Sequence, residues 1–536
     1  MKNLRYIGPF FRMNSLSQKE INGQLFYLSK EAVKTIVLHS KCGLVSPIKR
    51  YSKSSSTIDI TTNSNFSPLL CVYRKASPTL VHSKNSNGFD EDSFKKEINP
   101  STNALMTLSM LELLDYYRSF KDIDNSLYSI YELYKSLSKD QLEFYSINLR
   151  NTEGVFTEKK NLLENNSKNF NLIDKDKKFK FSDQAFMMLA YFVYSKKNNT
   201  EEVSKAYYEF SLEILSMFSN FKENVYECSL DEICKILLVF NILYSYEELP
   251  ELNALIIDFA DYAICKFDEK DYYINSLDVC SLCSIVLSLS YKHTHIISFL
   301  DKSTEIIERL YTLYDEDKGT FYKLSTKKEI KYSCTDITFY FLAFVIYGEI
   351  SDTTSKYKDM ILSIYKKFLI NSRLIPSWPS APTLDDFERY RGFSLNSADM
   401  IDESFFRMPD IPTPESTGIA PIFNKSLTYN RKKDTFSCDK VTFDSYKNFL
   451  NFYMFIHFFK DEYIKDMNLT PNIDNSRLSS ININDKGNPT DINTTNIESN
   501  DSLSNNNDIS SSDTVNLDPT EIIDENLNDD DFSSNK

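Results

Sequence analysis

Four aspartates occupy similar positions along the middle of the chain, each within two residues of a serine or threonine at the start of an apolar run. They are Asp183, Asp231, Asp278 and Asp336. Carboxylates can move protons, and hydrolysis of a glycosidic bond needs two of them, about 5 Å apart for retention or about 6.5–9.5 Å apart for inversion. The sequence does not pair them. We take Asp183 as a catalytic candidate and the other three as candidates for binding a substrate.

A second group of candidates lies in a long polar segment from Leu374 to Asp434, which holds the sole tryptophan. A long segment without periodicity in a compact domain is often functional. Aromatic faces stack on sugars, and carboxylates and arginines bind hydroxyls, so this mixture is typical of carbohydrate sites. The catalytic candidate here is Glu403, and the binding candidates are Trp378, Asp385, Asp386, Glu388, Arg389, Tyr390, Arg391, Asp402 and Arg407. Alternatively, the prolines of this segment pin it across the site as a plug.

Apolar helical runs must position these side chains, and six of them share an opening made of a turn residue, a spacer and an aromatic residue. The openings are NGF (87–89), GVF (154–156), NVY (224–226), DYY (271–273), GTF (319–321) and DTF (434–436). Glycine, asparagine or aspartate permits the turn, and the aromatic side chain folds back into the core. Ser182, Ser229 and Ser276 follow at equal intervals of 47 residues and are predicted to cap the next helices. Gln184 either binds a substrate or caps its own helix.

Two kinds of helix alternate between about Asn99 and Asp466. The runs after these openings, such as AFMMLAYFVY (185–194), are apolar on all sides and must be buried. Their partners, such as STEIIERLYTLYDED (303–317), carry charge on one face. Six such pairs predict an all-α (α/α)6 toroid, with an inner ring of buried helices inside an outer ring. A solenoid of helix pairs has a similar period and is the alternative.

The segment KFSDQAFMMLAYFVYSKKNNTEEVSKAYYEFSLEIL (180–215) resembles a stretch of the N-acylglucosamine 2-epimerase group and, more broadly, of the six-hairpin glycosidase superfamily. In that stretch an aromatic-Asp-Gln/His-Ala-Phe segment opens an inner helix. The resemblance implies an (α/α)6 barrel with a carbohydrate site in a funnel at the N-termini of the inner helices. It also implies histidines that transfer protons.

The five histidines of this chain stand away from that funnel. His39 and His82 precede the barrel, His293 and His295 follow the far end of an inner helix, and His457 lies well inside the last inner helix. The two histidines at 293 and 295 are too few ligands to predict a metal site. Acid/base chemistry would therefore fall to funnel carboxylates such as Asp183 and Glu403.

Composition narrows the class of protein. Of 536 residues, 41% are hydrophobic, while only 10 are glycine and 16 proline, which favours long helices over an all-β fold. The net charge of −15 disfavours nucleic-acid binding. We find no secretory signal and no run of roughly 20 apolar residues that could cross a membrane. Nine scattered cysteines are typical of buried, reduced thiols, so we expect a cytoplasmic protein without a cofactor.

Three regions are predicted. Residues 1–98 form an N-terminal extension, with a helix in 15–41 and strands in STIDITT (56–62) and SPLLCVYRKA (67–76). Residues 99–467 form the toroid. Residues 468–536, rich in asparagine, serine and aspartate, form a disordered acidic tail that is solvated or binds a protein partner.

These features predict a protein that binds or acts on carbohydrate, as a glycoside hydrolase or as a sugar isomerase or epimerase. The alternative is a non-enzymatic helical-repeat scaffold that binds protein partners through its rim or its tail. A deep acidic funnel with an aromatic wall would favour the enzyme, and a filled barrel would favour the scaffold.

Overall fold

The computed structural model describes residues 18–47, 66–76, 80–83, 86–89, 93–162, 170–176, 178–325, 327–379, 420–438 and 441–467. The chain divides into two compact units, 1–473 and 474–536, and all described residues belong to the first. The predicted tail (468–536) and the strand predicted at 56–62 lie outside the described residues.

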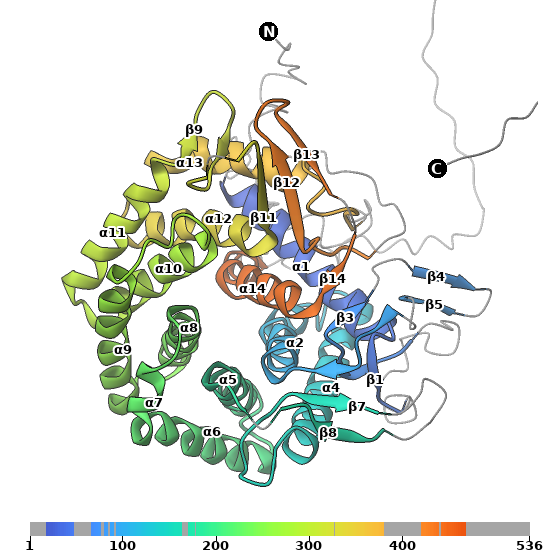
Figure 1. Ribbon diagram of the computed structural model, residues 1–536. Coiled ribbons are helices and arrows are strands. Elements are labelled where there is room, and N and C mark those ends of the chain that lie inside the picture. The colour runs from blue at the N-terminus through green and yellow to red at the C-terminus, as the bar shows by residue number, and fades with distance from the viewer. Residues whose placement is uncertain are drawn as a thin grey trace, which may run out of the picture. The chain divides into compact units, whose positions relative to one another are not determined.

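Six helical hairpins close into a ring (Figure 1). The inner helices are α2 (Pro100–Glu112), α5 (Phe181–Lys197), α8 (Leu230–Tyr246), α10 (Leu277–Thr294), α12 (Cys334–Ile350) and α14 (Ser445–Met467). Their outer partners, in the same order, are α4 (Asn125–Asn148), α6 (Glu202–Asn220), α9 (Pro250–Asp268), α11 (Ile297–Tyr311), α13 (Thr354–Ile364) and α1 (Gln18–His39). Each inner helix contacts the next, and α14 contacts α2. The ring therefore closes, which confirms the predicted (α/α)6 toroid and excludes the open solenoid.

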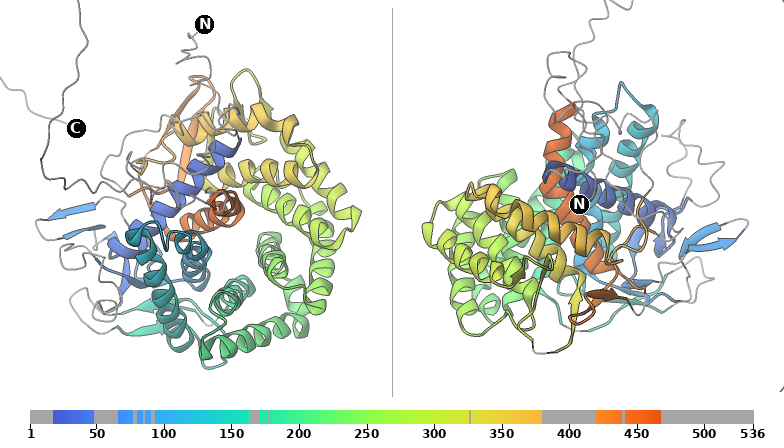
Figure 2. Two further views of the ribbon diagram at one scale, coloured as in Figure 1. Left: turned by 180° about the vertical axis from the view of Figure 1, so that it is seen from behind. Right: turned by 90° about the horizontal axis from the view of Figure 1, so that it is seen from above.

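The sixth hairpin joins the two ends of the described chain. Its outer helix, α1, comes from the N-terminal region and packs along α14 (Figures 1 and 2). The Tyr463 hydroxyl donates to the carbonyl of Lys19 (2.8 Å), and the rings of Tyr463 and Phe26 stack with centroids 5.1 Å apart. The helix predicted within the N-terminal extension is thus a member of the ring.

Burial explains why the two rings differ in sequence. The inner helix α12 is buried without a break from Cys334 to Gly348, because it has neighbours on every side. The outer helix α11 buries only one stripe, including Phe299, Ile306 and Leu310, and leaves its other face to solvent. Although the inner helices are apolar, none of the helices in the described ranges is long and apolar enough to cross a bilayer.

Three of the predicted openings use a left-handed turn residue. Gly154, Gly319 and Asp434 have φ of +85°, +58° and +50°, and the aromatic residues after the two glycines, Phe156 and Phe321, are buried. The NVY opening behaves differently, because it belongs to the short helix α7 (Lys222–Tyr226). The turn chemistry predicted from the sequence is therefore confirmed at three of the openings and replaced by a helical turn at a fourth.

Short antiparallel strands decorate the joints between hairpins. One sheet joins β11 (Glu329–Ser333), β12 (Ser426–Asn430) and β13 (Thr435–Ser437), with Ser333 opposite Ser426 and Glu329 opposite Asn430. A second joins β6 (Glu97–Ile98), β7 (Lys159–Asn161) and β8 (Leu172–Asp174). The pair β3 (Lys75–Ala76) and β14 (Phe443–Asp444) leads into α14. The segment 374–434 is therefore not wholly without regular structure, since β12 within it pairs with β11.

Candidate functional site

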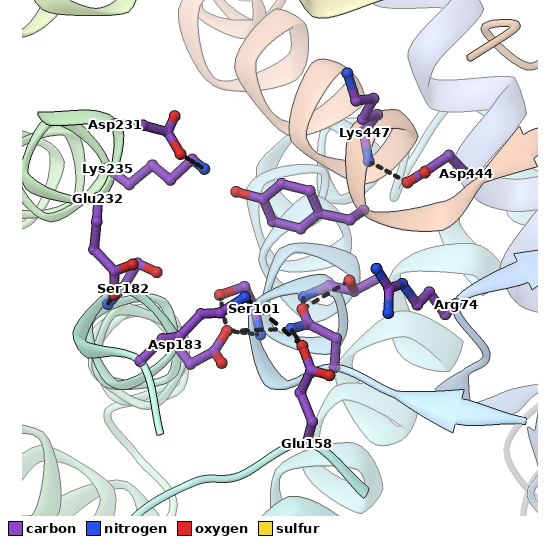
Figure 3. A pocket seen from close by; sticks show the side chains of 14 residues that line it. Arg74, Ser101, Glu158, Ser182, Asp183, Asp231, Glu232, Lys235, Asp444 and Lys447 are labelled. Carbon is purple, nitrogen blue, oxygen red and sulfur yellow. Dashed lines mark hydrogen bonds and ion pairs between the residues drawn. The ribbon is translucent and has the colours of Figure 1, made fainter. Parts of the chain in front are cut away.

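A pocket of about 270 Å³ opens where four inner helices begin (Figure 3). It is lined by the first turns of α2, α5, α8 and α14 and the residues just before them, together with one side chain from the β3 region and one from the segment before β7. The lining residues are Arg74, Asn99, Ser101, Thr102, Glu158, Lys180, Ser182, Asp183, Asp231, Glu232, Lys235, Asp444, Tyr446 and Lys447. The pocket thus lies at the ring mouth where the helix N-termini converge.

Acidic side chains at this mouth cap the neighbouring inner helix. Three backbone N–H groups at the starts of α2, α5 and α10 donate to a carboxylate of the next helix around the ring: Ser101 to Asp183 (3.1 Å), Ser182 to Glu232 (3.1 Å) and Asp278 to Asp336 (3.3 Å). The first turn of a helix leaves N–H groups without intrahelical partners, and its positive end favours an anion. The repeated acids therefore tie adjacent hairpins together.

The predicted serine caps are only partly confirmed. Ser229 accepts the Glu232 N–H at 3.3 Å and caps α8. Ser182 instead lies within α5, which begins after Lys180, and Ser276 makes no capping bond through its side chain. The cause is that carboxylates of the next helix, Glu232 and Asp336, accept N–H groups at the starts of α5 and α10.

Asp183 is a buried carboxyl with one oxygen free. Its Oδ1 accepts hydrogen bonds from the backbone N–H of Ser101 (3.1 Å), from the Ser101 hydroxyl and from Asn99 Nδ2 (3.4 Å). Its Oδ2 has no hydrogen-bond partner among the described residues, and the residue is 2% exposed. Burial outweighs the bonds from Ser101 and raises the pKa of Asp183 to about 6. A carboxyl with a pKa near neutrality and a free oxygen at a pocket can accept and return a proton.

A contact across the ring bounds the pocket. Lys235 on α8 donates to Asp231 Oδ2 (2.6 Å), and its ammonium lies 5.3 Å from the ring centroid of Tyr446 on α14. These two helices are not neighbours in the ring, so the contact spans the mouth. Burial raises the pKa of Tyr446 to about 12, so the phenol keeps its proton at neutral pH. The described lining includes no residue from the starts of α10 and α12.

The acids at those two helix starts form a separate cluster outside the lining. Thr335 donates to Asp278 Oδ2 (2.9 Å), and Lys323 pairs with Asp336 Oδ2 (2.7 Å). Burial, and then the nearby Asp336 charge, raise the pKa of Asp278. Both residues were predicted to bind a substrate, and the structure places them outside the described pocket lining.

The other predicted site residues fall in four places. Asp183 and Asp231 line the pocket. The Gln184 side chain bonds to the backbone of Phe156: it accepts the Phe156 N–H (2.9 Å) and donates to the Phe156 carbonyl (2.8 Å). Trp378 is buried and is not among the lining residues. The remaining candidates lie outside the described residues: Asp385, Asp386, Glu388, Arg389, Tyr390, Arg391, Asp402, Glu403 and Arg407.

No histidine is among the described lining residues. His293 and His295 stand at the C-terminal end of α10, where burial lowers the pKa of His293 to about 4. His457 bonds Glu112 Oε1 through its Nδ1 (2.8 Å), at the far end of the inner ring. The titratable groups of the described lining are therefore carboxyl, ammonium, guanidinium and phenol groups.

Most of the lining residues were not singled out from the sequence. Asn99, Ser101, Glu232 and Tyr446 stand at inner-helix starts, so the rule that selected Asp183 could have found them had it been applied to every residue type. Arg74 and Glu158 come from outside the helical repeat and carry no such signal. They reach the mouth only because β3 pairs with β14 and β7 pairs with β6.

Comparison with known proteins gives similarity in structure alone. No protein-family model matches the sequence. No curated protein matches it either. Among solved structures, the chain is similar to a D-mannose isomerase at 9% identity and a TM-score of 0.48, covering 83% of this chain and 100% of that one.

Two cellobiose 2-epimerases are also similar to the chain. The enzyme from Bacillus thermoamylovorans has 11% identity and a TM-score of 0.46, with 81% of this chain and 99% of that one covered. The enzyme from Spirochaeta thermophila has 9% identity and a TM-score of 0.42, with 81% and 98% covered. The toroid of this chain is established by its own closed ring of helices.

Proposed function

We propose that the chain is a carbohydrate-active protein that moves a proton on a sugar, as sugar isomerases and epimerases do, in the pocket at the ring mouth. The observation that carries this proposal is the state of Asp183. Its Oδ1 is fixed by three donors, its Oδ2 is free among the described residues, and its pKa is raised to about 6. A general base needs a pKa near the working pH and an oxygen that can reach the substrate.

The composition of the pocket supports a carbohydrate ligand. Thirteen of the fourteen lining side chains are charged, hydroxyl or amide groups, and Tyr446 supplies an aromatic face. A sugar hydroxyl both donates and accepts, so it needs this mixture of partners, whereas an apolar ligand would leave them unsatisfied. The volume of about 270 Å³ lies near the lower end of ligand pockets, about 300–1,000 Å³. We therefore favour a small sugar over a long polysaccharide.

The sequence resemblance points to the same place. The segment 180–215, which resembles the epimerase group, supplies Lys180, Ser182 and Asp183 to the pocket. The described lining holds no histidine, so we assign to Asp183 the proton transfer that histidines carry out in that group. The resemblance thus favours the same pocket, while the choice of Asp183 as the base rests on its geometry and pKa.

The reaction can be written on these side chains. Asp183 Oδ2 takes the proton from the carbon next to the sugar carbonyl, and the C–H electrons form the carbon–carbon double bond of an enediolate. The carbonyl oxygen gains the negative charge, which the Lys180 ammonium can stabilise. Lys180 lines the pocket, 3.8 Å from Glu158 Oε1, and its charge also acts on Asp183. Return of the proton to the opposite face of the same carbon epimerises the sugar. For isomerisation, the proton of the neighbouring hydroxyl first moves to the former carbonyl oxygen. The C–H proton then returns to the former carbonyl carbon, and the neighbouring oxygen becomes the new carbonyl.

Deuterium exchange tests this proposal without knowledge of the product, because it detects the removal of the proton itself. Wild-type protein is incubated in D₂O with glucose, mannose and cellobiose, and NMR follows deuterium at the carbon next to the carbonyl. We expect exchange with at least one sugar, reduced about 10²-fold or more in Asp183→Asn, which keeps the Oδ1 acceptor but removes the base. Glu209→Gln, on the exposed face of α6, is the control. Binding without exchange would contradict the catalytic part of the proposal.

A further inference from the structure

Three carboxylates that line the pocket have no ion-pair partner within 4 Å in the described part of the chain. They are Asp183, Glu232 and Asp444, each of which spends one oxygen on a backbone N–H group. Asp183 is also the most deeply buried of the three, and its Oδ2 is free. The ionised form of a buried carboxyl is unfavourable without a counter-ion, so a cationic group of a ligand would bind favourably there.

The four cations that line the pocket already have partners within the protein. Their nearest partners are Glu97 for Arg74 (3.0 Å), Glu158 for Lys180 (3.8 Å), Asp231 for Lys235 (2.6 Å) and the Thr335 hydroxyl for Lys447 (3.2 Å). Of the four, Lys180 also acts on Asp183 through its charge, but none forms an ion pair with Asp183 or Glu232 among the described residues. The remaining imbalance at that wall is negative.

Glu232 and Asp183 belong to one wall of the pocket (Figure 3). Glu232 Oε1 accepts the N–H of Ser182, the residue just before Asp183, at 3.1 Å. This bond leaves Glu232 Oε2 without a hydrogen-bond partner among the described residues, in the same pocket lining as the free Oδ2 of Asp183. Two free carboxylate oxygens on one wall match the donors of an ammonium group, which carries three N–H bonds.

We infer that the pocket prefers a sugar with a protonated amine, bound mainly by Glu232 next to Asp183. The inference rests on the proposed function, because it assigns the substrate class of the same pocket. The net charge of −15 favours the approach of such a cation. An ammonium at this wall also favours the ionised form of Asp183, which is the form that acts as a base.

The charged and titratable groups that face Asp183 define the expected proton coupling. Lys180 favours its ionised form and Glu158 opposes it, and Ser101 bonds it directly. The Tyr446 phenol, which keeps its proton at neutral pH, also lines the pocket, and Glu232 lies on the same wall as Asp183. A ligand cation would add to the effect of Lys180. Binding near pH 6 should therefore release a fraction of a proton from Asp183.

Calorimetry with matched sugars tests the inference. Glucosamine, glucose and N-acetylglucosamine, and the corresponding mannose and galactose sets, are titrated at about pH 6.5, where the free amine is protonated. We expect an amino sugar to bind about tenfold or more tightly than its neutral and N-acetyl counterparts, since a hydrogen bond to a charged group contributes about 1.5–3 kcal/mol. Repeating the titration in buffers of different ionisation enthalpy measures the released protons.

Variants separate the two carboxylates. In Glu232→Gln the preference for the amine should fall to about twofold or less, while the Ser182 N–H keeps its acceptor. In Asp183→Asn the proton release should disappear. Glu209→Gln should change neither quantity, and thermal unfolding confirms that each variant is folded.

The outcomes distinguish the inference from the proposed function. Equal binding of amino and neutral sugars would overturn the inference and leave the carbohydrate site in place. A preference of unchanged size in Glu232→Gln would also overturn it. Failure of every sugar to bind would remove both proposals.

Discussion

Asp183 shows how a single buried carboxyl connects chemistry with stability. The same burial that tunes it for proton transfer makes its ionised form unfavourable in the folded protein. Between about pH 4 and pH 6 the folded state holds a proton that the unfolded state releases. The free energy that this proton contributes to folding has its full value below pH 3.8, the pKa of the group in the unfolded state. It is lost as the pH rises through the folded-state pKa of about 6.

We therefore expect Asp183→Asn to stabilise the protein at neutral pH. The raised pKa corresponds to about 3 kcal/mol at 1.36 kcal/mol for each pH unit, and the asparagine keeps an acceptor for Ser101 and Asn99. Urea unfolding should show a gain of about 1–3 kcal/mol at pH 7.5 that shrinks towards pH 4. Glu209→Gln, at a side chain 61% exposed, should show no comparable trend. A variant less stable than the wild type at pH 7.5 would refute this account of Asp183.

The sequence predicted part of the site at this scale. The serine and aspartate openings located the helix starts, and two of the aspartates chosen there, Asp183 and Asp231, line the pocket. The sequence did not separate them from Asp278 and Asp336, because that separation depends on which helix starts face the pocket in the closed ring. Gln184 was equally ambiguous, since its partners are backbone groups of Phe156. Tertiary contacts of this kind leave no local pattern.

At the scale of helices, a buried ion cluster joins three inner helices at the end opposite the pocket. Glu112 on α2 bonds His457 (2.8 Å) and Lys460 on α14 and accepts from the Tyr246 hydroxyl of α8 (2.9 Å). Burial acts to raise the pKa of Glu112, but Lys460 and His457 outweigh it and hold the pKa below its usual range. The cluster therefore stabilises the fold above about pH 4.5, and its contribution decreases as the pH falls.

Glu112→Gln should destabilise the ring by about 3 kcal/mol at pH 7, because it leaves the buried Lys460 without its counter-charge. The double variant Glu112→Gln with Lys460→Met should recover much of this loss, since no buried charge remains unpaired. Urea unfolding at pH 7 measures both. A double variant that is no more stable than Glu112→Gln alone would argue against the charge explanation.

The turn at Gly319 gives a test of the repeated opening. Gly319 has φ of +58°, and a Cβ there would meet the Ser363 side chain, with Cβ at 3.4 Å and Oγ at 3.9 Å. A substitution therefore has space but a strained backbone. We expect Gly319→Val to lose about 1–2 kcal/mol and Gly319→Asn to lose less, because asparagine tolerates the left-handed region. Thermal unfolding compares the two. Equal losses would indicate that packing, not backbone conformation, selects glycine here.

At the scale of the whole ring, closure depends on the pairing of α1 with α14. The N-terminus of α1 lies against the C-terminal part of α14, as the bond from Tyr463 to Lys19 shows. The six inner helices were predicted correctly because each carries its own opening and apolar run. The partner of the last one was not, because a helix at the start of the chain carries no mark of the helix that it will meet.

A circular permutant tests this closure. Residues 467 and 18 are joined by a short Gly/Ser linker, and new ends are placed between Asp317 and Lys318, at an exposed turn. We expect the permutant to melt within about 5 °C of the parent. Deletion of residues 18–39 should instead expose the apolar faces of α14 and α13 and cause aggregation or loss of a cooperative transition. A cooperative, unshifted transition in the deletion variant would show that α1 is dispensable.

The same pairing has a consequence during synthesis on the ribosome. Asn22 and its hydrogen-bond partner Glu462 are 440 residues apart, so at roughly 5–20 residues per second the first helix emerges about 20–90 s before its partner exists. During that interval its apolar stripe, including Leu25, Val33 and Ile36, has no native surface to cover it. A nascent chain of this kind is a natural client for a holding chaperone, and slower translation would lengthen its exposure.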